Sequence, residues 1–289
     1  MRMLLTIAGA TGALGRAITI EALGRGLAVR ALVRDPARLA PALRDRIAIT
    51  VGDARDPATA ARAVAGADLV LSCAGASVLP GLRGWRSYAG VDGPINRTLF
   101  AAAAAARVGR AIYVSVHHPP AMRGVGYVAA HERVVDYMRD GAMPWAVVRP
   151  TGFFSALGSF VELARRGAFP EIGDGRARTN PIADQDLAAL CLDAALAAEP
   201  ALEIAAGGPD VMTRRELAEL AFAALGRPPR IRRIPTWLVR AGALALRPIH
   251  PRMSQFAGFM AALADHDAIA PVRGHRRLAE HFAAIARAV

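Results

Sequence analysis

The segment Leu4-Leu-Thr-Ile-Ala-Gly9-Ala-Thr-Gly12-Ala-Leu-Gly15 predicts the architecture of this chain. An apolar run that predicts a buried strand leads directly into three glycines, and an Ala-rich helical stretch over 13–23 follows. Gly9 permits a tight turn, Gly12 lets the backbone approach a pyrophosphate, and Gly15 lets the helix pack close to the sheet. The free N–H groups at such a helix N-terminus favour phosphate. The turn predicts a dinucleotide site made of Gly9, Ala10, Thr11, Gly12, Ala13, Leu14 and Gly15.

Strands and helices alternate along the first half of the chain. Apolar runs predict strands at 3–8, 28–33, 47–51, 68–73, 111–116 and 145–148. Helical stretches separate them at 13–23, from Pro36 onward, and at 57–64, 96–106 and 127–139. Such spacing implies parallel pairing with right-handed crossovers, and hence an α/β fold with a doubly wound parallel sheet.

The pattern changes after Pro150. We expect residues 1–155 to form a dinucleotide-binding Rossmann domain, and residues 156–289 a smaller, mostly helical substrate lobe partly interleaved with the sheet. Gly158–Gly175 is expected to be rich in loops, with a helix at 184–198 and a short strand at 202–205. Thr213-Arg-Arg-Glu216 predicts a capping box at the start of a helix over 213–225.

The chain has 289 residues, of which 54% are hydrophobic, so it can bury a sizeable core. Its 36 basic residues are all arginine, against 24 acidic ones, which gives a net charge of +12. The absence of lysine excludes a P-loop lysine, a Schiff-base lysine and a lysine general acid or base. The arginines are scattered without an aromatic-rich basic stretch, so we expect a small anionic ligand and no nucleic acid.

Cysteine usage and hydropathy suggest a cytoplasmic protein. Cys73 and Cys191 lie far apart in apolar strings, so we expect buried free thiols with neither a disulfide nor a metal site. No apolar stretch reaches about 18 residues, so no integral membrane segment is expected. Arg230, Arg232 and Arg233 precede the apolar run Pro235–Leu246. This pattern is typical of a membrane surface and equally of a lobe helix packed on the core, and both interpretations stay open.

The sequence motif Gly9-Ala-Thr-Gly12 at the first strand–helix junction resembles the glycine motif of the short-chain dehydrogenase/reductase superfamily. More narrowly, the chain is similar to its atypical, NmrA-like and isoflavone-reductase-like branch of NAD(P)H-binding proteins. The resemblance covers nearly the whole chain and is strongest over residues 3–155. It implies that Asp53 meets the adenine and that Ala74 and Gly75 lie along the ribose and phosphates. Pro150 and Thr151, in the family's next strand and loop, complete the implied cofactor site.

The end of the second strand bears on the choice of cofactor. An acidic residue at this tip would bond a ribose 2′-OH and favour NAD, whereas Arg accommodates a 2′-phosphate. Arg34 holds the tip position and Asp35 follows it. The sequence therefore favours NADP, with NAD as the alternative that Asp35 keeps open.

The resemblance also implies a catalytic set of Ser, Tyr and a Lys four residues after the Tyr. Ser115 ends the fifth strand, and Tyr127-Val-Ala-Ala-His131 stands where Tyr-x-x-x-Lys belongs. In one interpretation His131 replaces the lysine, Tyr127 donates the proton and Ser115 orients the substrate. In the other, Tyr127 and His131 are not catalytic, and the protein uses another acid or only binds the dinucleotide.

Apolar residues and a histidine border the expected substrate site. Gly152, Phe153 and Phe154 follow the sixth strand at the carboxyl edge of the sheet, and His117 lies just past Ser115. They suggest a small, apolar substrate, although core packing would explain the same aromatics. We therefore predict an NAD(P)H-dependent oxidoreductase that reduces an apolar carbonyl or enone. The alternatives are a non-catalytic NAD(P)H-sensing or scaffold protein and an isomerase or epimerase with tightly held cofactor.

Overall fold

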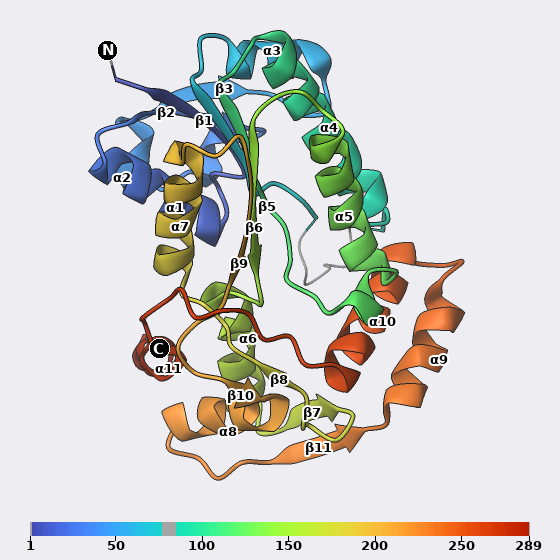
Figure 1. Cartoon of the computed structure of the whole chain (residues 1–289). Helices are drawn as coiled ribbons and strands as arrows, with labels where there is room; N and C mark the ends of the chain where they lie inside the picture. The colour runs from blue at the N-terminus through green and yellow to red at the C-terminus, as the bar shows by residue number, and fades with distance from the viewer. Residues whose placement is uncertain (1, 77–84, 289) are drawn as a thin grey trace.

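A computed structural model describes residues 2–76 and 85–288 of the chain (Figure 1). Its central sheet, as described, has seven parallel strands in the order β3-β2-β1-β4-β5-β6-β9. The strands of this sheet are β1 (Leu4–Ala8), β2 (Ala28–Val33), β3 (Ala48–Val51), β4 (Leu69–Ser72), β5 (Arg110–Val114), β6 (Trp145–Pro150) and β9 (Ala201–Ala206). The order reverses between β1 and β4, which places a ligand crevice at their carboxyl ends.

Helices cover both faces of the sheet (Figure 1). One face carries α1 (Ala13–Gly24) and α7 (Asp184–Leu196). The other face carries α3 (Pro57–Val64), α4 (Ala89–Ala105) and α5 (Gly126–Arg139). The short elements η1 (Pro36–Arg38), α2 (Pro41–Arg44) and η2 (Pro120–Met122) lie in the connections.

Two apolar cores lie on opposite sides of the sheet. Leu5 and Ile7 of β1 pack toward α1 and α7, whereas Val70 of β4 and Tyr113 of β5 pack toward α4 and α5. The inner strands β1, β4 and β5 are buried on both faces, which explains why their sequences are apolar runs and not alternating ones.

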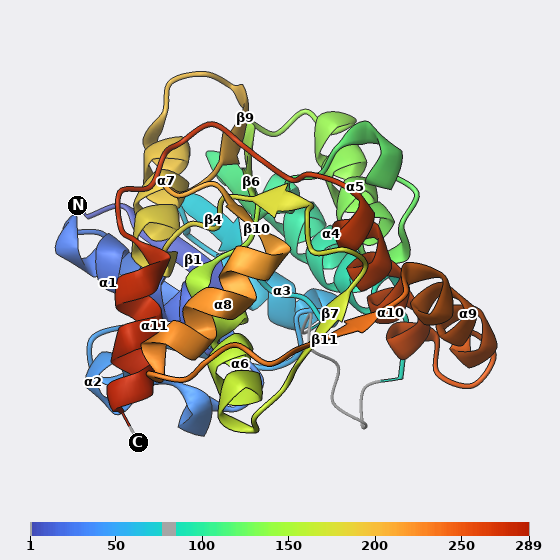
Figure 2. The ribbon, with the colours of Figure 1, turned by 90° about the horizontal axis from the view of Figure 1, so that it is seen from below.

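The C-terminal lobe lies beyond the carboxyl ends of the strands (Figures 1 and 2). Its elements are α6 (Phe154–Arg165), β7 (Phe169–Ile172), β8 (Arg178–Thr179), β10 (Met212–Thr213), α8 (Arg214–Ala224), β11 (Ile231–Ile234), α9 (Thr236–Leu246), α10 (Pro251–Asp265) and α11 (Leu278–Arg287). A third core joins α6, α8 and α11. The chain returns from the lobe to add α7 and β9 to the Rossmann layers, so the two parts are interleaved.

The doubly wound parallel sheet predicted from the sequence is confirmed, and β2 and α3 have the predicted bounds. The capping box at Thr213 and Glu216 is also present. The expectation of a loop-rich segment at Gly158–Gly175 is wrong, because α6 and β7 occupy much of it. A Cβ on Gly158 would lie 3.3 Å from the Cδ1 atom of Ile285, so this glycine allows α6 and α11 to approach closely.

Two predicted helices also have different bounds. The helix expected from Pro36 is only the three-residue η1, followed by the separate α2. Asp35 caps η1 with its side chain, and Pro41 begins α2. The helix predicted at 96–106 begins earlier, at Ala89, and includes Pro94.

Candidate dinucleotide and active site

The glycine turn between β1 and α1 leaves no room for side chains at two of its positions. Gly9 has φ +98°, which favours glycine, and its carbonyl accepts a hydrogen bond from the Gly12 N–H at 3.0 Å. A Cβ on Gly15 would lie 2.1 Å from the Gly9 carbonyl oxygen. A Cβ on Gly9 would lie 2.9 Å from the Cys73 carbonyl carbon. The turn, the start of α1 and the end of β4 therefore pack together through backbone.

The N-terminus of α1 is open to a ligand. Gly12 is the N-cap residue, and no side chain caps the helix. Gly12 and Ala13 are exposed, whereas Leu14 and Gly15 are buried beneath them. The first N–H groups of an α-helix have no partner within the helix, so this end suits the pyrophosphate of a dinucleotide.

At the end of β2 an exposed cation is followed by an acid whose carboxylate is already hydrogen-bonded within the protein. Arg34 is exposed. The Asp35 carboxylate caps η1 and accepts a hydrogen bond from the Ala37 N–H at 2.9 Å. Asp53 is paired with Arg55, and this hydrogen bond, with Arg34 also contributing, lowers the pKa of Asp53 to about 2. Both acids at this end of the site are therefore engaged within the protein, whereas Arg34 is exposed.

A buried polar pair on α4 supports the loop after β4. The Asp92 carboxylate accepts a hydrogen bond from the Ala76 N–H at 2.6 Å, and a Cβ on Gly75 would lie 3.0 Å from the same oxygen. Asn96, one turn further, donates to the Ala74 carbonyl oxygen and accepts from the Ser72 hydroxyl. Burial raises the pKa of Asp92 to about 7. Sequence reasoning missed both residues, although two polar side chains four positions apart in an Ala-rich helix are a usable signal.

Ser115 lies at the end of β5 with a buried hydroxyl. Its side chain is 5% exposed, and its Oγ has no hydrogen-bond partner among the described residues. The next residue, Val116, belongs to the same apolar cluster as Tyr127 of α5 and Phe259 of α10. Ser115 therefore follows the carboxyl end of β5, and its neighbour in the chain, Val116, packs in the same cluster as Tyr127.

The Tyr127 and His131 rings are in contact, but His131 is hydrogen-bonded elsewhere. Their centroids are 4.8 Å apart at an interplanar angle of 67°. His131 Nδ1 lies 2.7 Å from the Tyr113 hydroxyl on β5. Burial, with Arg149 and His118 nearby, lowers the pKa of His131 to about 4, so the ring is neutral at pH 7. Burial raises the pKa of Tyr127, and Asp92 and Tyr88 raise it further.

The other residues predicted to border the site lie around the end of β6. The His117 N–H donates to the Pro150 carbonyl oxygen at 2.8 Å, and burial lowers the pKa of its ring. The Thr151 hydroxyl donates to the Asn180 carbonyl oxygen at 2.7 Å. Gly152 has φ +152°, which favours glycine.

The two phenylalanines that follow have different surroundings. Phe153 is partly buried and packs against the core beside α1 and α7. Phe154 is buried in the core of the lobe, with its ring 5.5 Å from that of His281.

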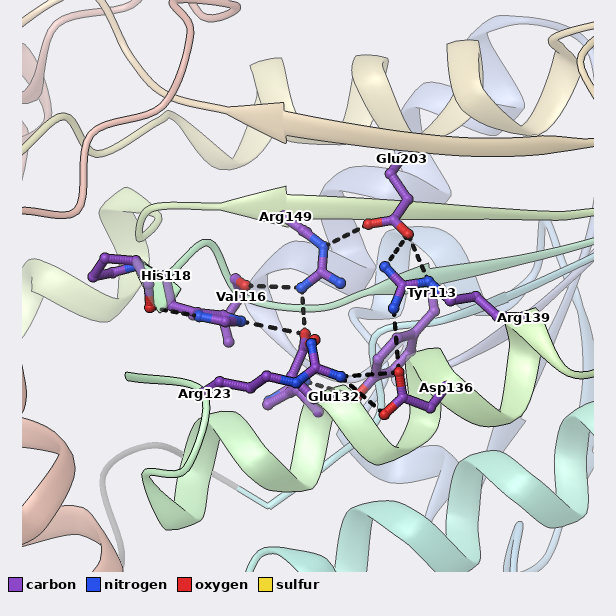
Figure 3. Close-up of polar contacts among 11 residues, drawn as sticks. Tyr113, Val116, His118, Arg123, Glu132, Asp136, Arg139, Arg149 and Glu203 are labelled. Atoms are coloured by element: carbon purple, nitrogen blue, oxygen red, sulfur yellow. Dashed lines mark hydrogen bonds and ion pairs between the residues drawn. The ribbon is translucent and has the colours of Figure 1, made fainter. Parts of the chain in front are cut away.

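Figure 3 shows an ion-pair network around Glu132, the residue after His131. The Glu132 carboxylate pairs with Arg149 of β6, with Arg123 at 2.5 Å and with His118 at 3.4 Å. Arg149 also pairs with Glu203 of β9 at 3.0 Å. Burial alone would raise the pKa of Glu132, but the hydrogen bonds and charges of His118 and Arg149 hold it at about 2. The network fixes α5, and with it Tyr127, against β6 and β9.

Substituting Glu132 by Gln should destabilise the fold by about 3 kcal/mol, because it leaves Arg149 without its buried partner. The pKa of Glu132 is depressed in the fold, so its contribution is present above about pH 4.5 and is lost as pH falls toward 2. Urea unfolding at several pH values measures both effects. Asp136→Asn, on the same helix but exposed, is the control and should cost less than about 1 kcal/mol. A Glu132→Gln protein as stable as the wild type would contradict this role.

Within residues 2–76 and 85–288, no cluster of three or more His, Cys, Asp or Glu side chains is arranged to hold a metal ion. Over the same residues, no helix is both long and apolar enough to cross a membrane.

Comparison with known proteins agrees with this geometry. A family model described as NAD(P)H-binding matches residues 9–198. The divinyl chlorophyllide a 8-vinyl-reductase of Zea mays is 33% identical over 114 residues, which are 38% of this chain and 28% of the maize protein. A (4-alkanoyl-5-oxo-2,5-dihydrofuran-3-yl)methyl phosphate reductase of Streptomyces griseus is 26% identical over 247 residues, covering 85% of this chain and 82% of that protein. The first four plant relatives are matched over only 24% to 33% of their own length.

Solved structures share the fold. The crystal structure of an NADPH-dependent quinone oxidoreductase of Escherichia coli with NADPH superposes with a TM-score of 0.72 and 21% identity, covering 97% of this chain and 99% of that one. Fold and site together define a Rossmann-type dinucleotide-binding protein. The chain belongs to the NAD(P)H-binding family, as the resemblance to atypical short-chain dehydrogenases/reductases implied.

Proposed function

We propose that this protein is an NADPH-dependent reductase of a small apolar carbonyl or enone compound. The observation that carries the proposal is the buried Ser115 hydroxyl just past the end of β5, which has no hydrogen-bond partner among the described residues. A buried hydroxyl without a partner is costly, and a bound polar group of a substrate would satisfy it. Relatives named as reductases support the reaction class.

The preference for NADPH rests on the tip of β2. Arg34 is exposed there, Asp35 is engaged in capping η1, and Asp53 is paired with Arg55. A guanidinium forms strong charge-assisted hydrogen bonds with phosphate, whereas a ribose 2′-OH offers it much less. The E. coli quinone oxidoreductase with the same fold was solved with NADPH, which supports the same preference.

Replacing Arg34 by Ala should weaken NADPH binding by about tenfold to a hundredfold, because a charge-assisted contact with the 2′-phosphate is lost. NADH binding should not change. Calorimetric titration of both cofactors measures the two affinities. Arg46→Ala removes another exposed arginine, from the connection between α2 and β3, and should leave both affinities at the wild-type values. Equal losses for NADPH and NADH would contradict recognition of the 2′-phosphate by Arg34.

The residues of the chain have distinct roles in the proposed reduction. Bound NADPH supplies the hydride. The Ser115 hydroxyl donates a hydrogen bond to the substrate oxygen and so orients it. Tyr127, whose pKa is raised, stays protonated at neutral pH and donates its proton to the reduced substrate. His131 is neutral and supports the Tyr127 ring by contact, without lowering its pKa as a charged group would.

The reductase is tested by following NADPH oxidation at its absorbance band with a panel of apolar ketones, enones and quinones. We expect saturable turnover for an enone or a quinone and little for hydrophilic carbonyls. Saturable turnover with none of these classes, by protein that binds NADPH, would contradict the proposal.

The second candidate is a dinucleotide sensor without catalysis, and the position of His131 favours it. A ring bound to Tyr113 and neutral at pH 7 cannot replace the positive charge of a lysine, and the chain contains no lysine. A sensor would bind NADPH without turnover and would change its protection from hydrogen exchange in α5 and α10 when the cofactor is added. Turnover that depends on Tyr127 would exclude it.

A further inference from the structure

The outer face of α9 is apolar and uncovered. Of its 11 residues only Ala243 is buried, while Trp237 and Leu244 are each 69% exposed and Leu238 is 50% exposed. Ile249, just past its end, is 71% exposed. Trp237 and Leu244 are seven positions apart and so share one side of the helix. In both ribbon views α9 lies at the periphery with α10 on its inner side (Figures 1 and 2).

Arginines lie before, on and after α9 in the chain. Arg232 and Arg247 are exposed, Arg233 is exposed and pairs with Glu171 at 3.4 Å, and Arg240 on α9 itself pairs with Asp265 at 2.5 Å. From residue 220 to residue 264 the sequence contains seven arginines and no acidic residue. An exposed apolar helix face with Trp and Leu, flanked in the chain by arginines, has the composition of helices that lie in the interface of an anionic bilayer.

We propose that α9 docks this protein on the surface of an anionic lipid membrane. The helix axis lies in the plane of the interface, Trp237, Leu238 and Leu244 enter the boundary between headgroups and acyl chains, and the arginines contact lipid phosphates. An 11-residue helix is about 16 Å long, too short to span a bilayer, so it lies on the membrane and does not cross it.

The charge of the chain favours a membrane over a second copy as the occupant of this face. A symmetric dimer would bring the same patch of both copies together, and with it the arginines of both copies. Each copy carries a net charge of +12, so the association would be opposed by repulsion between like charges. Anionic lipid has the opposite charge and an apolar interior, and so complements both parts of the surface.

The docking surface is continuous with the candidate active site. α9 packs on α10, and Phe259 of α10 contacts the Tyr127 ring with 4.6 Å between centroids. Gln255 of α10 accepts a hydrogen bond from the Tyr88 N–H at 3.0 Å. A substrate dissolved in the membrane would therefore meet the site close to the bilayer surface. Only this access route rests on the proposed reductase function, and the docking itself does not.

Sedimentation of the full chain with vesicles tests the proposal. We use vesicles of phosphatidylcholine alone and vesicles with about 30% phosphatidylglycerol, at about 0.1 M and about 1 M NaCl. The protein should sediment with the anionic vesicles and be released by high salt. Trp237→Ser combined with Leu244→Ser should reduce the bound fraction at least about tenfold. Ile20→Ser combined with Val211→Ser, which removes two apolar side chains exposed elsewhere, should bind as the wild type does.

The depth of the helix is read from tryptophan fluorescence with brominated lipid, which quenches only residues near the acyl chains. The measurement is made on Trp85→Phe protein, because Trp85 is also exposed, at 64%. Quenching should disappear when Trp237→Phe is added and persist when Trp145→Phe is added instead, whose residue lies on β6. Wild-type protein that stays in the supernatant with both vesicle types overturns the proposal. So does a dimer in solution that the paired Ser substitutions convert to a monomer, because a second copy would then cover α9. The same samples are also titrated with NADPH. Because cofactor binding does not require vesicles, loss of membrane binding with intact NADPH binding overturns only the docking proposal.

Discussion

Tyr127→Phe should lower kcat by about a hundredfold to a thousandfold, the usual contribution of a positioned proton donor, with little change in the affinity for NADPH. The substitution removes only the hydroxyl, and the Phe ring can keep the contacts with Tyr88, His131 and Phe259. Stopped-flow measurement of NADPH oxidation at saturating substrate gives the rate. Tyr137→Phe is the matched control, because Tyr137 lies on the same helix but contacts Arg97 at 5.2 Å. Undiminished turnover in Tyr127→Phe would show that another group donates the proton.

The pH dependence of the same reaction separates the two roles considered for His131. Because burial lowers the pKa of His131 to about 4, the ring is neutral from about pH 5 upward. We therefore expect no step in kcat near pH 6.5, the ordinary pKa of histidine. A rise in activity as pH falls through 6.5, lost in His131→Asn, would indicate that a protonated His131 replaces the lysine of the superfamily.

Gly12→Val should weaken NADPH binding by about a hundredfold while leaving the fold intact. Gly12 is exposed and has φ −81°, which any residue adopts, and its Cβ would lie 3.4 Å from the Gly9 carbonyl oxygen. The added side chain would stand where the pyrophosphate approaches the start of α1. Calorimetric titration measures the affinity, and thermal unfolding without cofactor shows whether the protein folds.

Gly24→Val is the matched control for Gly12→Val. Gly24 is the last residue of the same helix, and a Cβ there would meet no atom within 4 Å. The free energy of unfolding of the Gly24→Val protein should differ from that of the wild type by no more than about 0.5 kcal/mol, and its NADPH affinity should not change. If Gly12→Val also binds NADPH as the wild type does, the pyrophosphate does not lie on the glycine turn.

The Rossmann core was predictable because its signals are local. The strand at 28–33 and the helix at 57–64 are bounded by Gly, Asp and Pro residues that act within a few positions of the chain, and both have the predicted bounds. Predictions of secondary structure were less successful where contacts between distant parts of the chain determine the structure. Gly158 indicated a loop, yet it serves the close packing of α6 on α11. The apolar run of α9 leaves open from sequence whether the helix packs on the core or lies on a membrane surface, and most of the helix is exposed.

In the candidate site, too, local backbone geometry could be predicted from the sequence and long-range partners could not. The spacing of Gly9, Gly12 and Gly15 predicted a turn whose backbone geometry follows directly from the missing side chains. The partner of His131 could not be predicted, because Tyr113 approaches it from another element of the fold. The ion pairs of Glu132 likewise depend on the register of β6 and β9, which no local pattern encodes.

We expect the turn between β1 and α1 to hold a nicotinamide dinucleotide, with Arg34 selecting NADPH. Calorimetric titration of the wild-type protein with NADPH and with NADH measures both affinities. We expect one NADPH per chain, bound at least about tenfold more tightly than NADH. Failure of both cofactors to bind at concentrations up to about 1 mM would show that the glycine turn is not a dinucleotide site.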